Sequence, residues 1–252
     1  MNVSEHLDNL ASAGPRLAGA AGAAGPDAPV PSCPEWVVRD LVRHQGGIHR
    51  WATGYVAGPR REMWEADLDE IVGTWPSDAD LLGWFAEGHA NLVGALADAD
   101  PDLLCWTFLA APSPLQMWAR RQAHETTVHG IDAELAAGWE PAAIPADFAA
   151  DGVDELLTCF ITRPFSKLRA QTNQRLGISS TDAAGDWLVA IGPDGPPVTS
   201  RGAADSADCV VTGRAEDLYL ALWNRRATDV LTVEGDHRVL DLFRDKVHVR
   251  WR

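Results

Sequence analysis

Two residues near the middle of the chain have the types and the spacing of metal ligands. The stretch RRQAHETTVHGIDAE, residues 120–134, resembles the H-E-x-x-H motif of zinc proteases, but its histidines are one residue too far apart. On an α-helix, His124 and His129 point about 140° away from each other, whereas Glu125 and His129 differ by only about 40°. The pair that can bind one metal ion is therefore Glu125 with His129.

A third ligand is predicted on an earlier helix. His44 falls on the apolar stripe of residues 37–55, so it faces the interior of a helical bundle. His49 lies off this stripe and is expected at its rim. Two imidazoles and one carboxylate from facing helices suit a divalent metal such as zinc, and three protein ligands leave a coordination position open, as in catalytic sites. We predict a metal site formed by His44, Glu125 and His129.

A simpler interpretation of these residues stays open. Inward-facing histidines are commonly hydrogen-bonded core residues, and a buried Glu–His pair can be purely structural. Burying several such groups without a partner is costly, however, and a metal ion supplies that partner. Asp132 is either a hydrogen-bond acceptor for a ligating imidazole or a salt-bridge partner. A fourth protein ligand, from His49, His89 or His6, would close the coordination sphere and favour a structural metal.

The spacing of apolar residues predicts four helices in the first half of the chain. They are expected at 3–20, from 32 to about 55, at 78–98 and at 115–137. Ser32 and Glu35 have the spacing of a capping box, with Pro34 in the first turn of the second helix. Cys33 is then part of a helix cap or, alternatively, a reactive thiol at a helix N-terminus. Gly138 is expected to end the fourth helix.

The pattern changes after a two-proline linker at 138–147. A short helix is expected at 146–161, and the period then alternates between strands and helices. Strands are predicted within 186–198, 207–213 and 229–236, and helices at 214–226 and 237–247. The predicted fold class is a mainly α N-terminal four-helix bundle, residues 1–140, followed by a small α+β C-terminal domain, residues 146–252.

Composition argues against several kinds of partner. The formal net charge of −15 argues against binding to nucleic acid or to anionic lipid, both of which need basic surfaces. No run of residues has the length and apolarity to span a bilayer, and the first thirty residues do not resemble a secretory signal. Four scattered cysteines without a C-x-x-C pair favour reduced thiols. We expect a cytoplasmic monomer.

The segments VPSCPEWVVRDLVRHQGGIHRWA and RRQAHETTVHGIDAE resemble the two signature stretches of the mycothiol-dependent maleylpyruvate isomerase family. The resemblance covers almost the whole chain and implies a DinB-like metal-binding bundle followed by a domain similar to sterol carrier protein 2. The family's L-x-x-H and E-x-x-x-H patterns fall on His44, Glu125 and His129. The resemblance also implies an active-site arginine from the C-terminal domain. Of the two arginines in LWNRR, Arg225 and Arg226, we assign this role to Arg225.

The resemblance implies an enzyme that uses zinc and, as a small-molecule thiol cosubstrate, mycothiol. A zinc-bound thiolate would attack a small electrophilic substrate, and an arginine would hold a substrate carboxylate through two hydrogen bonds. Expulsion of the thiol after bond rotation gives cis–trans isomerisation, whereas retention of the adduct gives S-transfer. Two other classes stay open: a non-catalytic protein that binds a metal or an apolar ligand, and a zinc hydrolase that activates water.

Overall fold

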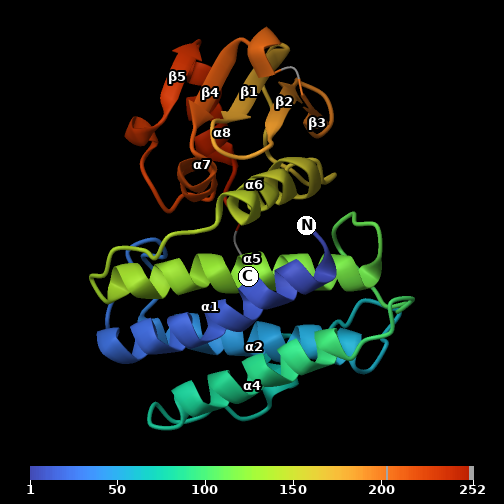
Figure 1. The fold of residues 1–252 in the computed structure, drawn as a ribbon, viewed down its shortest axis with the longest axis vertical. Helices are drawn as coiled ribbons and strands as arrows, with labels where there is room; N and C mark the ends of the chain where they lie inside the picture. Colours follow the sequence, from blue (N-terminus) through green and yellow to red (C-terminus); the bar gives the residue numbers. More distant parts are fainter. Residues whose placement is uncertain (203, 250–252) are drawn as a thin grey trace. The chain divides into compact units, whose positions relative to one another are not determined.

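Helices build the first part of the chain, and a sheet with flanking helices builds the second (Figure 1). The computed structural model describes residues 1–202 and 204–249. Residue 203 and residues 250–252, the last of the predicted second domain, lie outside the described residues. The chain divides into two units, Met1–Ala142 and Ala143–Arg252. The predicted fold class, a helical bundle followed by a small α+β domain, is confirmed. No helix among the described residues has the length and apolarity to cross a membrane.

The first unit is a bundle of four long helices with one short helix between the second and the third. The helices are α1 (Val3–Ala24), α2 (Val38–Val56), α3 (Leu68–Val72), α4 (Leu81–Ala97) and α5 (Pro114–Ala136). Both α1 and α2 pack against α4 and α5, so each buries a wide face. One apolar cluster of this core contains Leu17, Ala20, Ala21, Val30, Val38, Leu41, Val42, Leu81, Phe85 and Ala133.

The predicted start of the second helix is wrong. α2 begins at Val38, and the segment before it is a series of turns. Pro34 disfavours helical backbone at the residue before it, Cys33, which delays the helix. The expected capping hydroxyl, Ser32 Oγ, instead donates a hydrogen bond to Asp132 Oδ1 on α5 at 2.5 Å. The motif therefore connects a loop to the helix that carries two candidate ligands.

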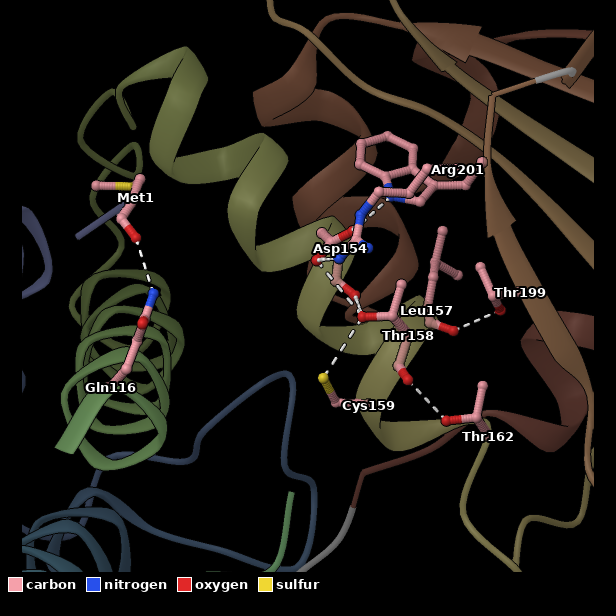
Figure 2. Close-up of polar contacts among 10 residues, drawn as sticks. Met1, Gln116, Asp154, Leu157, Thr158, Cys159, Thr162, Thr199 and Arg201 are labelled. Atoms are coloured by element: carbon pink, nitrogen blue, oxygen red, sulfur yellow. Dashed lines mark hydrogen bonds and ion pairs between the residues drawn. The ribbon is translucent and has the colours of Figure 1, made fainter. Parts of the chain in front are cut away.

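Helix-capping residues mark both ends of α5. The Ser113 side chain accepts a hydrogen bond from the Gln116 backbone N–H, and Pro114 occupies the first turn. Gly138, with φ of 73°, follows the last turn as predicted. The Gln116 amide also donates to the carbonyl oxygen of Met1 at 3.1 Å (Figure 2). This bond fixes the start of α5 beside the start of the chain.

The second unit contains a five-stranded sheet with the strand order β3-β2-β1-β4-β5. Only β1 and β4 are parallel; the other neighbours are antiparallel. The strands are β1 (Gln174–Ser180), β2 (Asp186–Ile191), β3 (Val198–Arg201), β4 (Cys209–Gly213) and β5 (Thr232–Gly235). The helices of this unit are α6 (Ala146–Glu155), which continues as a π-helical turn (Leu156–Phe160), α7 (Ala215–Leu222) and α8 (His237–Lys246).

Polar contacts join α6 and its π-helical turn to the sheet (Figure 2). The carboxylate of Asp154 accepts two hydrogen bonds from Arg201, each 2.7 Å long, and a third from Trp187 Nε1 at 2.9 Å. One turn on, Thr199 Oγ1 donates to the carbonyl oxygen of Leu157 at 2.5 Å. A π-helical turn frees carbonyl groups from the regular helical pattern, and a side chain on β3 uses one of them.

Candidate metal centre

The structure brings His44, Glu125 and His129 together inside the bundle. His44 comes from α2, and the other two residues come from successive turns of α5. One ligand atom from each residue lies within 4.8 Å of those of the other two. His44 Nε2 is 3.7 Å from Glu125 Oε1, and the two imidazole rings have centroids 5.2 Å apart. Residues far apart in the sequence thus converge on one point.

Three polar atoms of His44 and Glu125 are buried without hydrogen-bond partners in the described part of the chain. Among the residues that the structure describes, His44 Nε2 and both carboxylate oxygens of Glu125 have none. Such atoms destabilise a fold unless something satisfies them. Two imidazoles and a carboxylate are the donors that zinc and similar divalent cations prefer. The group therefore fits a divalent metal ion, both in its chemistry and in its unsatisfied atoms.

Neighbouring groups favour the ionised form of Glu125. Burial alone would raise the pKa of this carboxyl group. The nearby imidazole of His44, the Arg121 guanidinium and His129 outweigh burial and hold the pKa at about 2. Arg121 Nε lies 3.5 Å from Glu125 Oε2, one helical turn away on α5. An anionic carboxylate at neutral pH is what a cation site needs.

A second carboxylate sets the orientation of the His129 ring. His129 Nδ1 and Asp132 Oδ2 are 2.9 Å apart, and because a carboxylate only accepts hydrogen bonds, Nδ1 carries the proton. Nε2 is then left with its lone pair, as a metal ligand requires. Asp132 is fully buried; besides Ser32, it has the thiol of Cys33 at 3.9 Å from Oδ2. The contact is the one expected of Asp132 as an acceptor for an imidazole N–H, and with a protonated His129 it would also be the predicted salt bridge.

An indole ring lies against both candidate histidine ligands. The Trp36 ring centroid is 4.9 Å from that of His44 and 6.0 Å from that of His129. Sequence spacing does not reveal this residue because it belongs to the loop before α2. Arg121 had a detectable signal, since it lies four residues before Glu125 and so on the same helix face. The sequence predicts a helix-capping role for Ser32, whereas in the structure its hydroxyl donates to Asp132.

The other histidines of the bundle do not join the candidate ligands. Within the described part of the chain, the group that contains His44 is completed only by Glu125 and His129. His49, expected at the rim, is fully buried, because α2 packs against both α4 and α5. The ring of His89 lies 5.4 Å from that of His49, away from the candidate ligands. The alternative of a fourth ligand from His49, His89 or His6 is therefore not supported.

Arg225 and Arg226 belong to the second unit, in the segment after α7. Arg225 Nη1 donates a hydrogen bond to the Trp223 carbonyl oxygen at 2.8 Å. Arg226 forms an ion pair with Asp217. Both guanidinium groups therefore have contacts in this structure. The role of Arg225 stays a prediction.

The fold and the site together define a class of protein: a helical bundle with an internal His–Glu–His group, followed by a small sheet domain. The family model described as the mycothiol maleylpyruvate isomerase N-terminal domain matches residues 7–134, and the model described as the C-terminal domain of that family matches residues 147–242. The chain belongs to the mycothiol maleylpyruvate isomerase family. No curated protein matches the chain at a significant level.

Solved structures share the fold over nearly the full length. The crystal structure of the mycothiol-dependent maleylpyruvate isomerase matches with a TM-score of 0.62 and 14% sequence identity, over 94% of this chain and 95% of that one. The crystal structure of a histidine-to-alanine mutant matches with a TM-score of 0.61 at the same identity and coverage. At this identity the likeness concerns the fold of the two chains.

Proposed function

We propose that this protein is a metal-dependent isomerase that uses mycothiol as its thiol cosubstrate and acts on a small electrophile of the maleylpyruvate type. The observation that carries the proposal is the convergence of His44, Glu125 and His129 inside the bundle, where His44 Nε2 and both Glu125 carboxylate oxygens are buried without a hydrogen-bond partner among the described residues. Family membership supports the choice of thiol and of reaction. Zinc is the metal proposed, on the basis of the donor set.

His44, Glu125 and His129 would hold the metal ion. When bound, a divalent cation favours the thiolate over the thiol and so makes a better nucleophile available at neutral pH. Glu125 contributes a negative charge that protons do not compete for near neutrality, because its pKa is about 2. Asp132 keeps the proton of His129 on Nδ1. Trp36 covers the two imidazoles on one side and restricts the access of water there.

The proposed reaction conserves the thiol. The thiolate sulfur adds to one carbon of a conjugated cis double bond, and the electron pair moves into the adjacent carbonyl group. The former double bond is now single and rotates. Return of the electron pair re-forms the double bond in the trans configuration and expels the thiolate. Arg225 is proposed to bind a substrate carboxylate with a two-pronged hydrogen bond. We favour isomerisation over S-transfer because isomerisation is the activity for which the family is named.

The first test is the metal content of the full chain, purified without a histidine tag. We expect about one metal ion per chain in the wild type, because the ligands form a single group, and loss of the metal in His44→Ala and Glu125→Ala. His237→Ala, which changes an exposed histidine, is the control and should keep the metal. Conversion of maleylpyruvate to its trans isomer, measured with and without mycothiol, then tests the reaction.

The metal content and the conversion assay distinguish an error in the ligand set from an error in the proposed reaction. Metal that persists in both ligand variants would refute the ligand set. Metal lost as expected, but without mycothiol-dependent conversion, would leave the metal centre standing and reject the proposed reaction.

A further inference from the structure

A second layer of polar side chains lies in the bundle next to the candidate metal ligands. Gln45 follows His44 on α2, and Thr126 follows Glu125 on α5. The amide Nε2 of Gln45 donates to Thr126 Oγ1 at 3.0 Å, and His49 Nε2 lies 2.9 Å from each of these two atoms. Gln45, His49 and Thr126 are fully buried. The same two helices therefore carry two polar groups, one beside the other.

The hydrogen bonding of this second layer is incomplete. Within the described residues, Gln45 Oε1 and His49 Nδ1 have no partner. Exchanging the amide oxygen and nitrogen of Gln45 does not remove the deficit, because one amide atom then faces Thr126 and His49 and the other is still unpaired. Either tautomer of His49 also leaves Nδ1 unpaired, as a donor or as an acceptor. The deficit is a property of the fold and not of the atom assignment.

Gln122 adds a further unsatisfied amide to the same face of α5. This side chain is fully buried, and neither its Nε2 nor its Oε1 has a partner among the described residues. Residues four apart on a helix share a face. One turn before Gln122, the ring of Trp118 stacks on that of Tyr55 of α2, with centroids 5.0 Å apart; one turn after it, Thr126 meets Gln45 and His49. Gln122 therefore lies on the face of α5 that is turned toward α2, between these two contacts.

The side chains of the second layer are neutral, and an aromatic ring lies beside them. The His49 ring lies 5.3 Å from the ring of Phe85. Burial, together with the neighbouring imidazole of His89, lowers the pKa of His49 well below its usual value, so His49 is neutral at physiological pH. His89 is fixed by a hydrogen bond from its Nε2 to the Leu10 carbonyl oxygen at 2.9 Å. Neutral donors and acceptors favour a neutral ligand that both donates and accepts hydrogen bonds.

We propose that Gln45, His49 and Gln122 form an internal binding site for a neutral hydroxyl group, adjacent to the candidate metal centre. Two sources offer this chemistry: water that occupies the site in the resting protein, and an alcohol group of the thiol cosubstrate. The second source rests on the proposed function. Buried water commonly makes about three hydrogen bonds to otherwise unsatisfied groups, and two amides with one imidazole provide that number.

The site can be tested by whether Gln122→Leu lowers or raises the unfolding midpoint of the protein. Gln122→Leu keeps the size of the side chain and removes its amide. If a ligand bridges Gln122 to the layer, the unfolding midpoint of the full chain falls by about 2–6 °C, because the ligand and its other partners lose hydrogen bonds. If the amide has no ligand, removing it relieves a buried unsatisfied group, and the midpoint rises. Gln171→Leu, at an exposed position, is the control and should change the midpoint by about 1 °C or less.

A crystal structure of the wild type at high resolution distinguishes the two sources and does not depend on the variant folding. Electron density within hydrogen-bond distance of Gln122 and His49 Nδ1, in crystals grown without any thiol, identifies water. Density that appears there only in crystals grown with mycothiol identifies the hydroxyl group of the cosubstrate. Absence of density in both crystals, or a raised midpoint for Gln122→Leu, overturns the proposal. Neither measurement depends on which residues bind the metal.

Discussion

At the scale of single residues, the candidate metal centre depends on atoms that never touch the metal position. His129 is held by Asp132, and Asp132 is held in turn by Ser32 from a loop of the chain some hundred residues earlier. The proton on His129 Nδ1 and the buried carboxylate determine which nitrogen faces Glu125 and His44. The three ligands are therefore only part of the site. Hydrogen bonds that connect His129, Asp132 and Ser32 set the orientation of the His129 ring.

This support makes a testable prediction for Asp132. Asp132→Ala leaves the three ligands intact but frees the ring of His129 to rotate or to exchange its tautomer. We expect the affinity for zinc to fall by about 10–100-fold, the range found when the outer partner of a ligating histidine is removed. Competition with a chelating dye measures this change. Asp8→Ala, an exposed aspartate on α1, should leave the affinity unchanged, and equal affinities for Asp132→Ala and the wild type would refute the role of Asp132.

At the scale of helices and strands, periodicity located the candidate ligands but not their surroundings. A repeat of 3.6 residues fixes which side chains share a face, so Glu125, His129 and His44 could be selected from the sequence. It does not say how wide the buried face is. His49 was placed at the rim on the basis of one stripe, yet α2 buries a second face against α4. Loop residues such as Trp36 and Ser32 have no period, and only the tertiary fold brings them to the site.

The central strand of the sheet was missed for a related reason. β1, QRLGISS, has only two large apolar residues, Leu176 and Ile178, and its polar ends resemble a loop. Between them lies Gly177, where a β-carbon would collide with the carbonyl oxygen of Ala204. The strand is specified by its neighbours: β2 and β4 pair with it on both sides. Local composition could not reveal a strand whose glycine is required by a long-range contact.

The close approach at Gly177 predicts a large effect of a single methyl group. Gly177→Ala forces the backbone of β1 and the segment at Ala204 apart, and we expect the free energy of unfolding to fall by about 1–3 kcal/mol, as for other overpacked positions. Gly83→Ala is the matched control, because a β-carbon at this exposed helical position meets nothing within 4 Å. It should stabilise the protein by up to about 1 kcal/mol. Urea denaturation of both variants checks the contrast, which fails if the two changes have the same sign.

At the scale of the whole molecule, family membership extends over both units, while the candidate ligands all belong to the first. The two family models match residues 7–134 and 147–242, so the second unit is as characteristic of the family as the bundle is. Its proposed contribution is the guanidinium of Arg225. If the proposed function is right, activity should need both units, whereas metal binding should need only the first.

This separation can be measured by hydrogen exchange on the full-length protein, with and without zinc. Because the three ligands connect α2 to α5, zinc at about 100 times its dissociation constant should stabilise the bundle by about 2.7 kcal/mol. Amide exchange that requires opening of these helices should slow by up to about 100-fold. Strands β1, β2 and β4 contain none of the ligands, and their amides should exchange at unchanged rates.

A variant of the charged ligand is the control for this experiment. Glu125→Gln removes the negative charge and should abolish the protection in both helices. Protection confined to the second unit, or protection that survives in Glu125→Gln, would contradict a metal centre formed by α2 and α5.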